Sequence, residues 1–194
     1  MANANRPFGL RPHSSLNGGP YNGNIRQYCV PATDTTAIFI GDPVKLAGSE
    51  SKVNADDMLF PTATKAASTE VVAGVCVGVI PTPSDLSVLY RKASTAMYIL
   101  VDTDPNTIYA VQGNNATWDG DDVGLNANFT VSTASTTTGT SNLVLNQSTA
   151  ATTTTLDLQI LGSAPIIDND LSGVYPVILV RLNNHQFVDG VTGL

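Results

Sequence analysis

The feature that most constrains the fold of this chain is its series of short β-branched runs, separated by turn residues and almost free of helical periodicity. The runs recur roughly every 8 to 15 residues, a spacing typical of an all-β sandwich or barrel. Val71–Ile80 is the strongest run: it is rich in valine, ends at Pro81 and predicts a strand buried on both faces. Ser84–Ala96 is compatible with one short helix or with two strands. The sequence therefore predicts an all-β fold, a single β-barrel or jelly-roll-like sandwich.

The centre of the chain carries two runs of this kind in close succession. Met97–Val101 is apolar, and Thr107–Gln112 alternates. Between them lies Asp102–Asn106, whose proline fixes φ and whose Asp and Asn residues tolerate tight turns. We expect the two runs to form a β-hairpin with a five-residue loop (Asp102–Asn106). A polar, acidic segment at 114–122 follows and contains the sole tryptophan, Trp118.

Composition divides the chain into an N-terminal arm and a body. Residues 1–27 are so rich in glycine and proline that they predict an extended arm without a helical or strand period. Residues 28–194 form the predicted β-barrel or sandwich domain. Within it, a Thr/Ser-rich segment at about 130–155 predicts strands joined by polar turns, with Gly139 at a bend and a surface elaboration as one interpretation. The last strand is expected at Val174–Leu182.

Charge is distributed unevenly along the chain. The formal net charge is −7, which makes a phosphate backbone, and hence nucleic acid, an unfavourable partner for the body. Residues 1–33 nevertheless contain Arg6, Arg11 and Arg26 and no acidic residue. A basic arm on an acidic body suits docking on a neighbouring copy or on another acidic protein.

The arm supplies the candidate partner-binding residues. Arg6 and Arg11 would meet acidic groups of a partner. Phe8, Leu10 and Tyr21 are the expected apolar anchors, because isolated apolar side chains on an arm usually need a surface to bury against. A disordered terminus is the alternative interpretation of the same segment.

The acidic turn at 102–106 has part of the pattern of a calcium-binding loop. Asp102, Asp104 and Asn106 have the spacing that opens a calcium loop. However, Thr107 occupies the position of the expected glycine, and Gly113 that of the bidentate glutamate. A simple turn is therefore favoured, and no metal site is predicted.

No other motif indicates chemistry. His13 and His185 lack metal-ligand spacing, and Cys29 and Cys76 form neither a CxxC pattern nor a disulfide framework. There is no GxSxG elbow. We therefore predict a non-enzymatic protein with no catalytic residue and no cofactor. The absence of a signal-peptide pattern and of an apolar run of ~18 residues predicts a soluble protein made in the cytoplasm, with no membrane partner.

Several motifs, taken in order, resemble those of tailed-bacteriophage virion proteins, specifically capsid cement (head decoration) proteins. They are MANANRPFGLRP at 1–12, GDPVKL at 41–46, GVCVGV at 74–79, VDTDPNTIYAVQ at 101–112, DVGLNANF at 122–129 and LNNH at 182–185. The resemblance covers most of the chain, and the Thr-rich stretch at 132–155 is its least similar part.

The resemblance implies a structural virion protein without catalytic residues. It would bind the outer surface of an icosahedral phage head and stabilise contacts between major capsid subunits, often as a homotrimer. Related cement proteins have β-barrel or jelly-roll folds. The expected partners are thus the major capsid protein and further copies of the chain, and the expected location is the outside of the virion, after synthesis in the host cytoplasm.

Two other functions remain open at this point. One is a different virion component, either a head fibre base or a tail protein. The other is a carbohydrate-binding β-sandwich with Trp118 and Tyr109 on its binding face.

Overall fold

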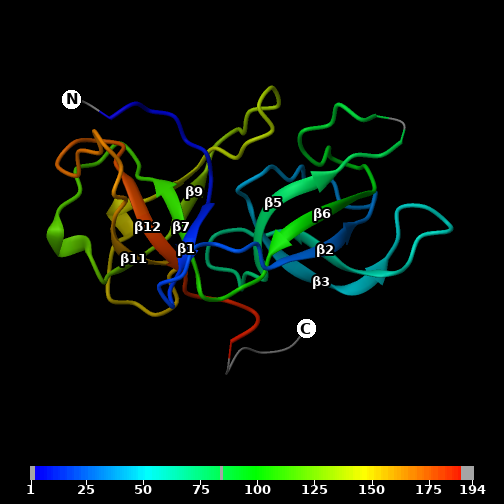
Figure 1. Ribbon diagram of the computed structural model, residues 1–194, viewed down its shortest axis with the longest axis horizontal. Coiled ribbons are helices and arrows are strands. Elements are labelled where there is room, and N and C mark those ends of the chain that lie inside the picture. Colours follow the sequence, from blue (N-terminus) through cyan, green and yellow to red (C-terminus); the bar gives the residue numbers. More distant parts are fainter. Residues whose placement is uncertain (1–2, 84, 189–194) are drawn as a thin grey trace.

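The computed structural model describes residues 3–83 and 85–188, and it confirms the predicted all-β class (Figure 1). Apart from two single-turn 3₁₀ helices, η1 (Gly120–Asp122) and η2 (Gln147–Thr149), its regular elements in this range are strands. The strands are β1 (Arg11–Ser15), β2 (Ile25–Val30), β3 (Pro43–Ser51), β4 (Phe60–Lys65), β5 (Gly74–Ile80), β6 (Met97–Asp102), β7 (Thr107–Gln112), β8 (Asn126–Ala127), β9 (Phe129–Val131), β10 (Leu143–Leu145), β11 (Leu158–Ser163) and β12 (Val177–Leu182).

Five strands close into a small barrel, in the order β2-β4-β3-β5-β6. β6 pairs antiparallel with β2 on one side and with β5 on the other. A parallel contact between Cys29 and Thr62 joins β2 to β4. The interior is filled mainly by small and β-branched side chains, which suit so narrow a barrel. They are Tyr28, Val30, Ile38, Val44, Ala63, Cys76, Ile99 and Val101.

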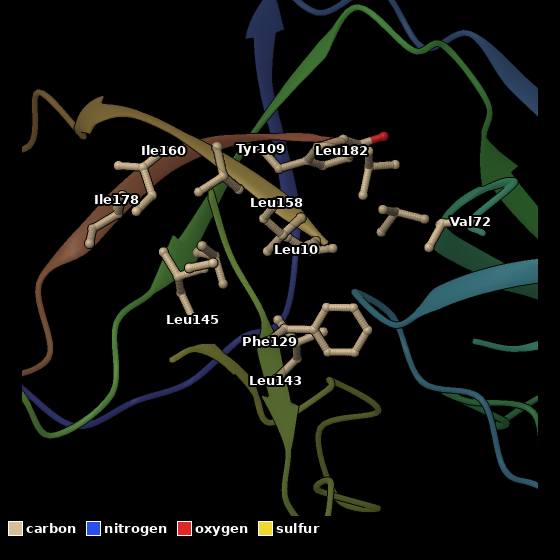
Figure 2. Close-up of a cluster of buried hydrophobic side chains, with 14 of the residues drawn as sticks. Leu10, Val72, Tyr109, Phe129, Leu143, Leu145, Leu158, Ile160, Ile178 and Leu182 are labelled. Carbon is tan, nitrogen blue, oxygen red and sulfur yellow. The ribbon is translucent and has the colours of Figure 1, made fainter. Parts of the chain in front are cut away.

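The remaining strands form a second β unit beside the barrel. A five-stranded sheet runs β1-β7-β12-β11-β8, and the β9–β10 pair packs with it around a larger apolar core. Figure 2 shows leucine, isoleucine and phenylalanine side chains from both layers meeting in this core. Val72, from the connection that precedes β5, also enters this core. A residue that lies between two barrel strands in the sequence therefore belongs to the core of the second unit.

The central hairpin prediction is wrong, although both of its strands exist. β6 and β7 occupy the expected runs, but β7 pairs with β1 and β12 and does not pair with β6. The turn at 102–106 therefore carries the chain from the barrel into the second unit. A short turn permits a hairpin without requiring one, because the pairing partner depends on which distant strands compete for each edge.

The remaining predictions of strands and loops are confirmed only in part. β5 is fully buried only at its start, Gly74–Cys76, and half-buried beyond. The described residues of Ser84–Ala96 form neither a helix nor a strand, and residue 84 lies outside the described range. β9 and β10 pair as expected for the Thr/Ser-rich segment, and Gly139 has a φ of 70°, as a bend requires. β12 begins directly after Pro176, which lacks an N–H for the sheet ladder.

A buried carboxylate joins the two units. Asp42 is fully buried, accepts a hydrogen bond from Ser141 Oγ at 2.5 Å and pairs with Lys65 Nζ at 2.8 Å. At the preceding residue, the Gly41 carbonyl accepts a hydrogen bond from the Leu10 amide at 2.9 Å. The Gly41-Asp42-Pro43 sequence therefore links the barrel to the N-terminal segment and to the β9–β10 hairpin. The Thr/Ser-rich segment is thus part of the joint rather than a mere surface elaboration.

Candidate docking surfaces

The N-terminal segment lies across the second unit of its own chain. Its extended residues 3–10 are held by side-chain amides: Asn3 Nδ2 donates to the Asp170 carbonyl at 2.7 Å. Further along, the Arg6 amide donates to Gln112 Oε1 at 3.0 Å. In Figure 1 the blue N-terminal segment runs beside the orange β11–β12 connection, in agreement with these contacts. The segment is therefore extended, as predicted, but bound in cis.

Part of this segment is a strand that the sequence analysis did not predict. Arg11–Ser15 forms β1 and pairs antiparallel with β7 at the edge of the sheet. The register shifts between Pro12 and Ser14. An edge strand with an irregularity tolerates a proline that a central strand would not. At its other end, the predicted arm boundary at residue 27 falls inside β2.

Two of the five predicted partner-binding residues are anchors within the chain itself. Leu10 is 1% exposed and belongs to the core of the second unit. Tyr21 is half-buried, and its hydroxyl is buried without a hydrogen-bond partner among the described residues. Burial, and then the negative charges of Asp102 and Asp104, raise the pKa of Tyr21 to about 12. Leu10 is thus buried by its own chain, and Tyr21 is partly covered by it.

The other three remain at the surface. Arg6 and Arg11 are exposed, and Phe8 is half-buried. The Arg11 guanidinium carbon lies 4.7 Å from the centre of the Phe8 ring, within the range of a cation–π contact. The structure thus brings Phe8 and Arg11 together, with Arg6 two residues before the ring.

These residues border an apolar surface that sequence reasoning missed. Ile167 is 90% exposed and Ile166 is 53% exposed, both in the β11–β12 connection. Together with Arg6 and Phe8 they line a pocket of about 410 Å³. We call these four residues the arm surface. The sequence does contain a signal for the arm surface: two adjacent isoleucines follow Pro165 directly in a polar turn.

Further exposed apolar side chains belong to two loops at the opposite end of the molecule, the β3–β4 and β5–β6 connections (Figure 1). Met58 and Leu59, in the β3–β4 connection, are 75% and 60% exposed, and Leu86, in the β5–β6 connection, is 78% exposed. The two connections meet around Tyr98, whose hydroxyl donates to Asp57 at 2.8 Å, and they border a pocket of about 190 Å³. We call Met58, Leu59 and Leu86 the barrel tip.

One buried arginine organises the loops behind the barrel tip. Arg91 is fully buried and donates to four backbone carbonyls at 2.6–2.9 Å. The acceptors are the carbonyls of Pro31, Asp34, Thr36 and Thr95. The guanidinium therefore links the β2–β3 connection to the end of the β5–β6 connection, two segments that are distant in sequence.

The buried titratable groups serve packing and turns. The Tyr109 hydroxyl donates to Asp102 at 3.0 Å, and burial raises the pKa of both groups. Burial also raises the pKa of the Cys76 thiol to about 12, which leaves it a poor nucleophile. Asp104 accepts a hydrogen bond from the Asn106 amide at 2.9 Å, which agrees with the turn interpretation. Across residues 3–83 and 85–188 no three His, Cys, Asp or Glu side chains gather to hold a metal ion.

The prediction that Trp118 and Tyr109 form a carbohydrate-binding face is wrong. Trp118 is 1% exposed and Tyr109 is not exposed at all, so neither ring can stack on a sugar at the surface. A Cβ added to Gly113 would lie 2.5 Å from Trp118 Nε1, which shows how closely the indole packs on the backbone.

Comparisons with known proteins identified no relative: no protein-family model, curated protein or solved structure matches the chain. Within the described residues, no helix has the length and apolarity needed to cross a membrane. The sequence resemblance and the two surfaces are therefore the basis for a functional proposal.

Proposed function

We propose that this chain is a capsid cement protein, which binds the outer surface of an icosahedral phage head and stabilises contacts between major capsid subunits. The observation that carries the proposal is that exposed apolar side chains belong to loops at opposite ends of one molecule. A protein that holds neighbouring subunits together needs at least two contact sites, and the joint at Asp42 keeps these two in a fixed relation.

Binding through two ends explains how modest surfaces could hold against the pressure of packaged DNA. When one end is bound, the other is confined near its own site, and this effective concentration raises the overall affinity without a new type of contact. Exposed apolar side chains rimmed by charged groups are typical of protein interaction sites. Arg6 and Arg11 would add charge-assisted contacts to acidic groups on the capsid.

The proposed partners are the major capsid protein and further copies of the chain, in a homotrimer. The oligomeric state can be measured by light scattering at low and high salt. A salt-resistant particle near three times 20.2 kDa would support a preformed trimer. If the purified protein is a monomer, the trimer would form only on the capsid. Cosedimentation with heads then tests whether the monomer binds there.

The decisive experiment is cosedimentation of purified variants with DNA-free heads. Ile167→Asp and Met58→Asp each place a charge on one surface, and the double variant changes both. We expect each single variant to lower the affinity for heads about tenfold, since a charge in a desolvated contact costs at least 1.4 kcal/mol, and the double variant to abolish binding.

Leu16→Asp is the matched control, because Leu16 is likewise an exposed apolar residue (44%) but lies on neither surface. Circular dichroism confirms that each variant is folded. If the folded double variant still saturated the heads, the two-surface assignment would be wrong. Recovery of the wild-type protein with purified tails, and not with heads, would favour the tail-protein alternative.

A further inference from the structure

The outer edge of β9 has no neighbouring strand. β9 pairs with β10 on one side, and this sheet contains those two strands alone among the described residues. The Phe129 amide points away from β10 and donates to Asp157 at 3.3 Å. Because backbone groups alternate along a strand, Val131 presents its amide and carbonyl to the same side. The Phe129 amide is thus already occupied by Asp157, and the Val131 amide and carbonyl are the groups that can hydrogen-bond an additional strand.

The other outer strands of the second unit are protected against such pairing. β1 contains Pro12 and a register irregularity, and a bridge from Ser14 to Pro20 covers part of it. β8 is only two residues long, and a bridge joins Asn126 to Ala151. Proline, irregular register and covering segments are the usual means of blocking edges. β9, with the sequence Phe-Thr-Val, has no proline, no charge and no irregularity in its register.

A groove of about 570 Å³ lies along this edge. Phe129 and Ala66, both buried, contribute to it, together with Ala67 and the exposed Val131. The groove is thus bounded by a strand edge on one side and by the small side chains that follow β4 on the other. Because the groove has a second wall opposite the strand edge, it suits a single extended segment rather than the edge of another complete sheet.

The charges in the groove define its occupant further. Lys65 is the one charged residue that lines it among the described residues, and its Nζ already pairs with the buried Asp42 at 2.8 Å. A charged side chain entering the groove would lose its water without gaining a free counter-ion, which is unfavourable. The occupant is therefore uncharged where it enters.

We infer that the groove beside β9 binds an extended, uncharged segment of a partner polypeptide. The segment adds a strand to β9 through main-chain hydrogen bonds and places small apolar side chains against Ala66 and Ala67. Neither the arm surface nor the barrel tip contributes to this groove, so the inference does not rest on the proposed function.

The test is selection of a displayed library of random seven-residue peptides on the purified full chain. We expect enrichment of peptides whose central residues are uncharged and include Val, Ile, Thr or Ala. Val131→Lys places a charge in the groove and should weaken binding of the enriched peptides at least tenfold. Val123→Lys is the matched control, since Val123 is also an exposed valine (47%) but does not line the groove, and it should leave binding within about twofold.

Ala67→Asp provides a second variant that changes the opposite wall and leaves β9 intact, so that a folding defect in one variant does not decide the result. Failure to enrich any peptide, or equal binding by Val131→Lys and wild type, would overturn the inference. A wild-type dimer that Val131→Lys dissociates would also overturn it, because the occupant would then be a second copy of the chain.

Discussion

The barrel and the second β unit differ in the kinds of side chain that they bury. The barrel encloses few large side chains, and two of its buried charged residues make several hydrogen bonds each: Arg91 donates to four carbonyls, and Asp42 accepts from Lys65, Ser141 and the Phe39 amide. The second unit has the larger apolar core. In and beside it, however, Trp118 Nε1 and His185 Nε2 are buried without a hydrogen-bond partner in the described structure.

The difference indicates what specifies each region. Apolar packing tolerates substitutions that keep the volume, whereas a hydrogen-bonded buried charge tolerates almost none, because each lost partner leaves a desolvated group behind. The barrel loops should thus depend on single polar residues, and the second unit on filled volume. Four measurements test this comparison.

The largest effect is expected at Arg91. Arg91→Met keeps much of the side-chain volume but leaves four backbone carbonyls without their donor. We expect the free energy of unfolding to fall by about 4 kcal/mol, as measured by urea denaturation. Arg91→Lys should be intermediate, since an ammonium cannot reproduce the planar fork of donors. A loss below about 1 kcal/mol in Arg91→Met would break the comparison.

In the second unit, volume should matter most. Leu143 is fully buried in the larger core, and Leu143→Ala should cost about 3 kcal/mol through lost transfer energy and the cavity left behind. Leu143→Met, which nearly conserves volume, should cost less than about 1.5 kcal/mol. Equal losses in the two variants, by the same denaturation assay, would mean that shape and not volume specifies this core.

His185 should make stability depend on pH, because its Nδ1 accepts a hydrogen bond from the Phe187 amide while its buried Nε2 has no partner among the described residues. Burial lowers the pKa of His185 to about 4 from its usual 6.5. Between these values the unfolded chain binds a proton that the folded chain does not, so stability decreases as pH falls from 6.5 to 4. The expected loss from this group between pH 7 and pH 5 is about 2 kcal/mol.

The difference between wild type and His185→Gln isolates this contribution. Subtraction removes the other buried groups, including Asp102, whose raised pKa acts in the opposite direction. His13→Gln is the control, because His13 is exposed. If unfolding curves of wild type and His185→Gln changed in parallel with pH, His185 would not be a buried neutral group.

The smallest effect is expected at an arginine that lies outside both cores. Arg11 is exposed and contacts the Phe8 ring, so Arg11→Gln should cost only about 0.5 kcal/mol. Arg11→Lys, which keeps a cation near the ring, should cost less. A loss near that of Arg91→Met would show that the cation–π contact, and not burial, decides the value of an arginine in this protein.

Local chemistry in the sequence was sufficient for the fold class and for most strands. β-branched runs between turn residues located β5, β6, β7 and β12 to within a few residues. The turn at 102–106 and the bend at Gly139 were predicted because Asp, Asn, Pro and Gly have strong conformational preferences of their own. Such preferences depend on a residue and its nearest neighbours, so they can be read without the fold.

The candidate docking surfaces were predictable only in part. The charge of the arm pointed to Arg6 and Arg11, and the structure leaves both exposed. Leu10 and Tyr21 were expected to face a partner, yet the chain buries them in whole or in part itself. Met58, Leu59, Leu86, Ile166 and Ile167 could not be distinguished from core residues, because an isolated apolar side chain in the sequence does not reveal its exposure.

The sequence by itself determined that this chain forms strands, where most of them lie, and that an extended, basic N-terminal segment precedes an acidic body. The tertiary structure alone decided that β6 and β7 belong to different units, that β1 completes a sheet edge and that Arg91 is buried. The physical reason is that strand pairing and burial depend on contacts between residues far apart in the chain. A strand edge accepts whichever distant partner also buries its side chains, and no local preference encodes that choice.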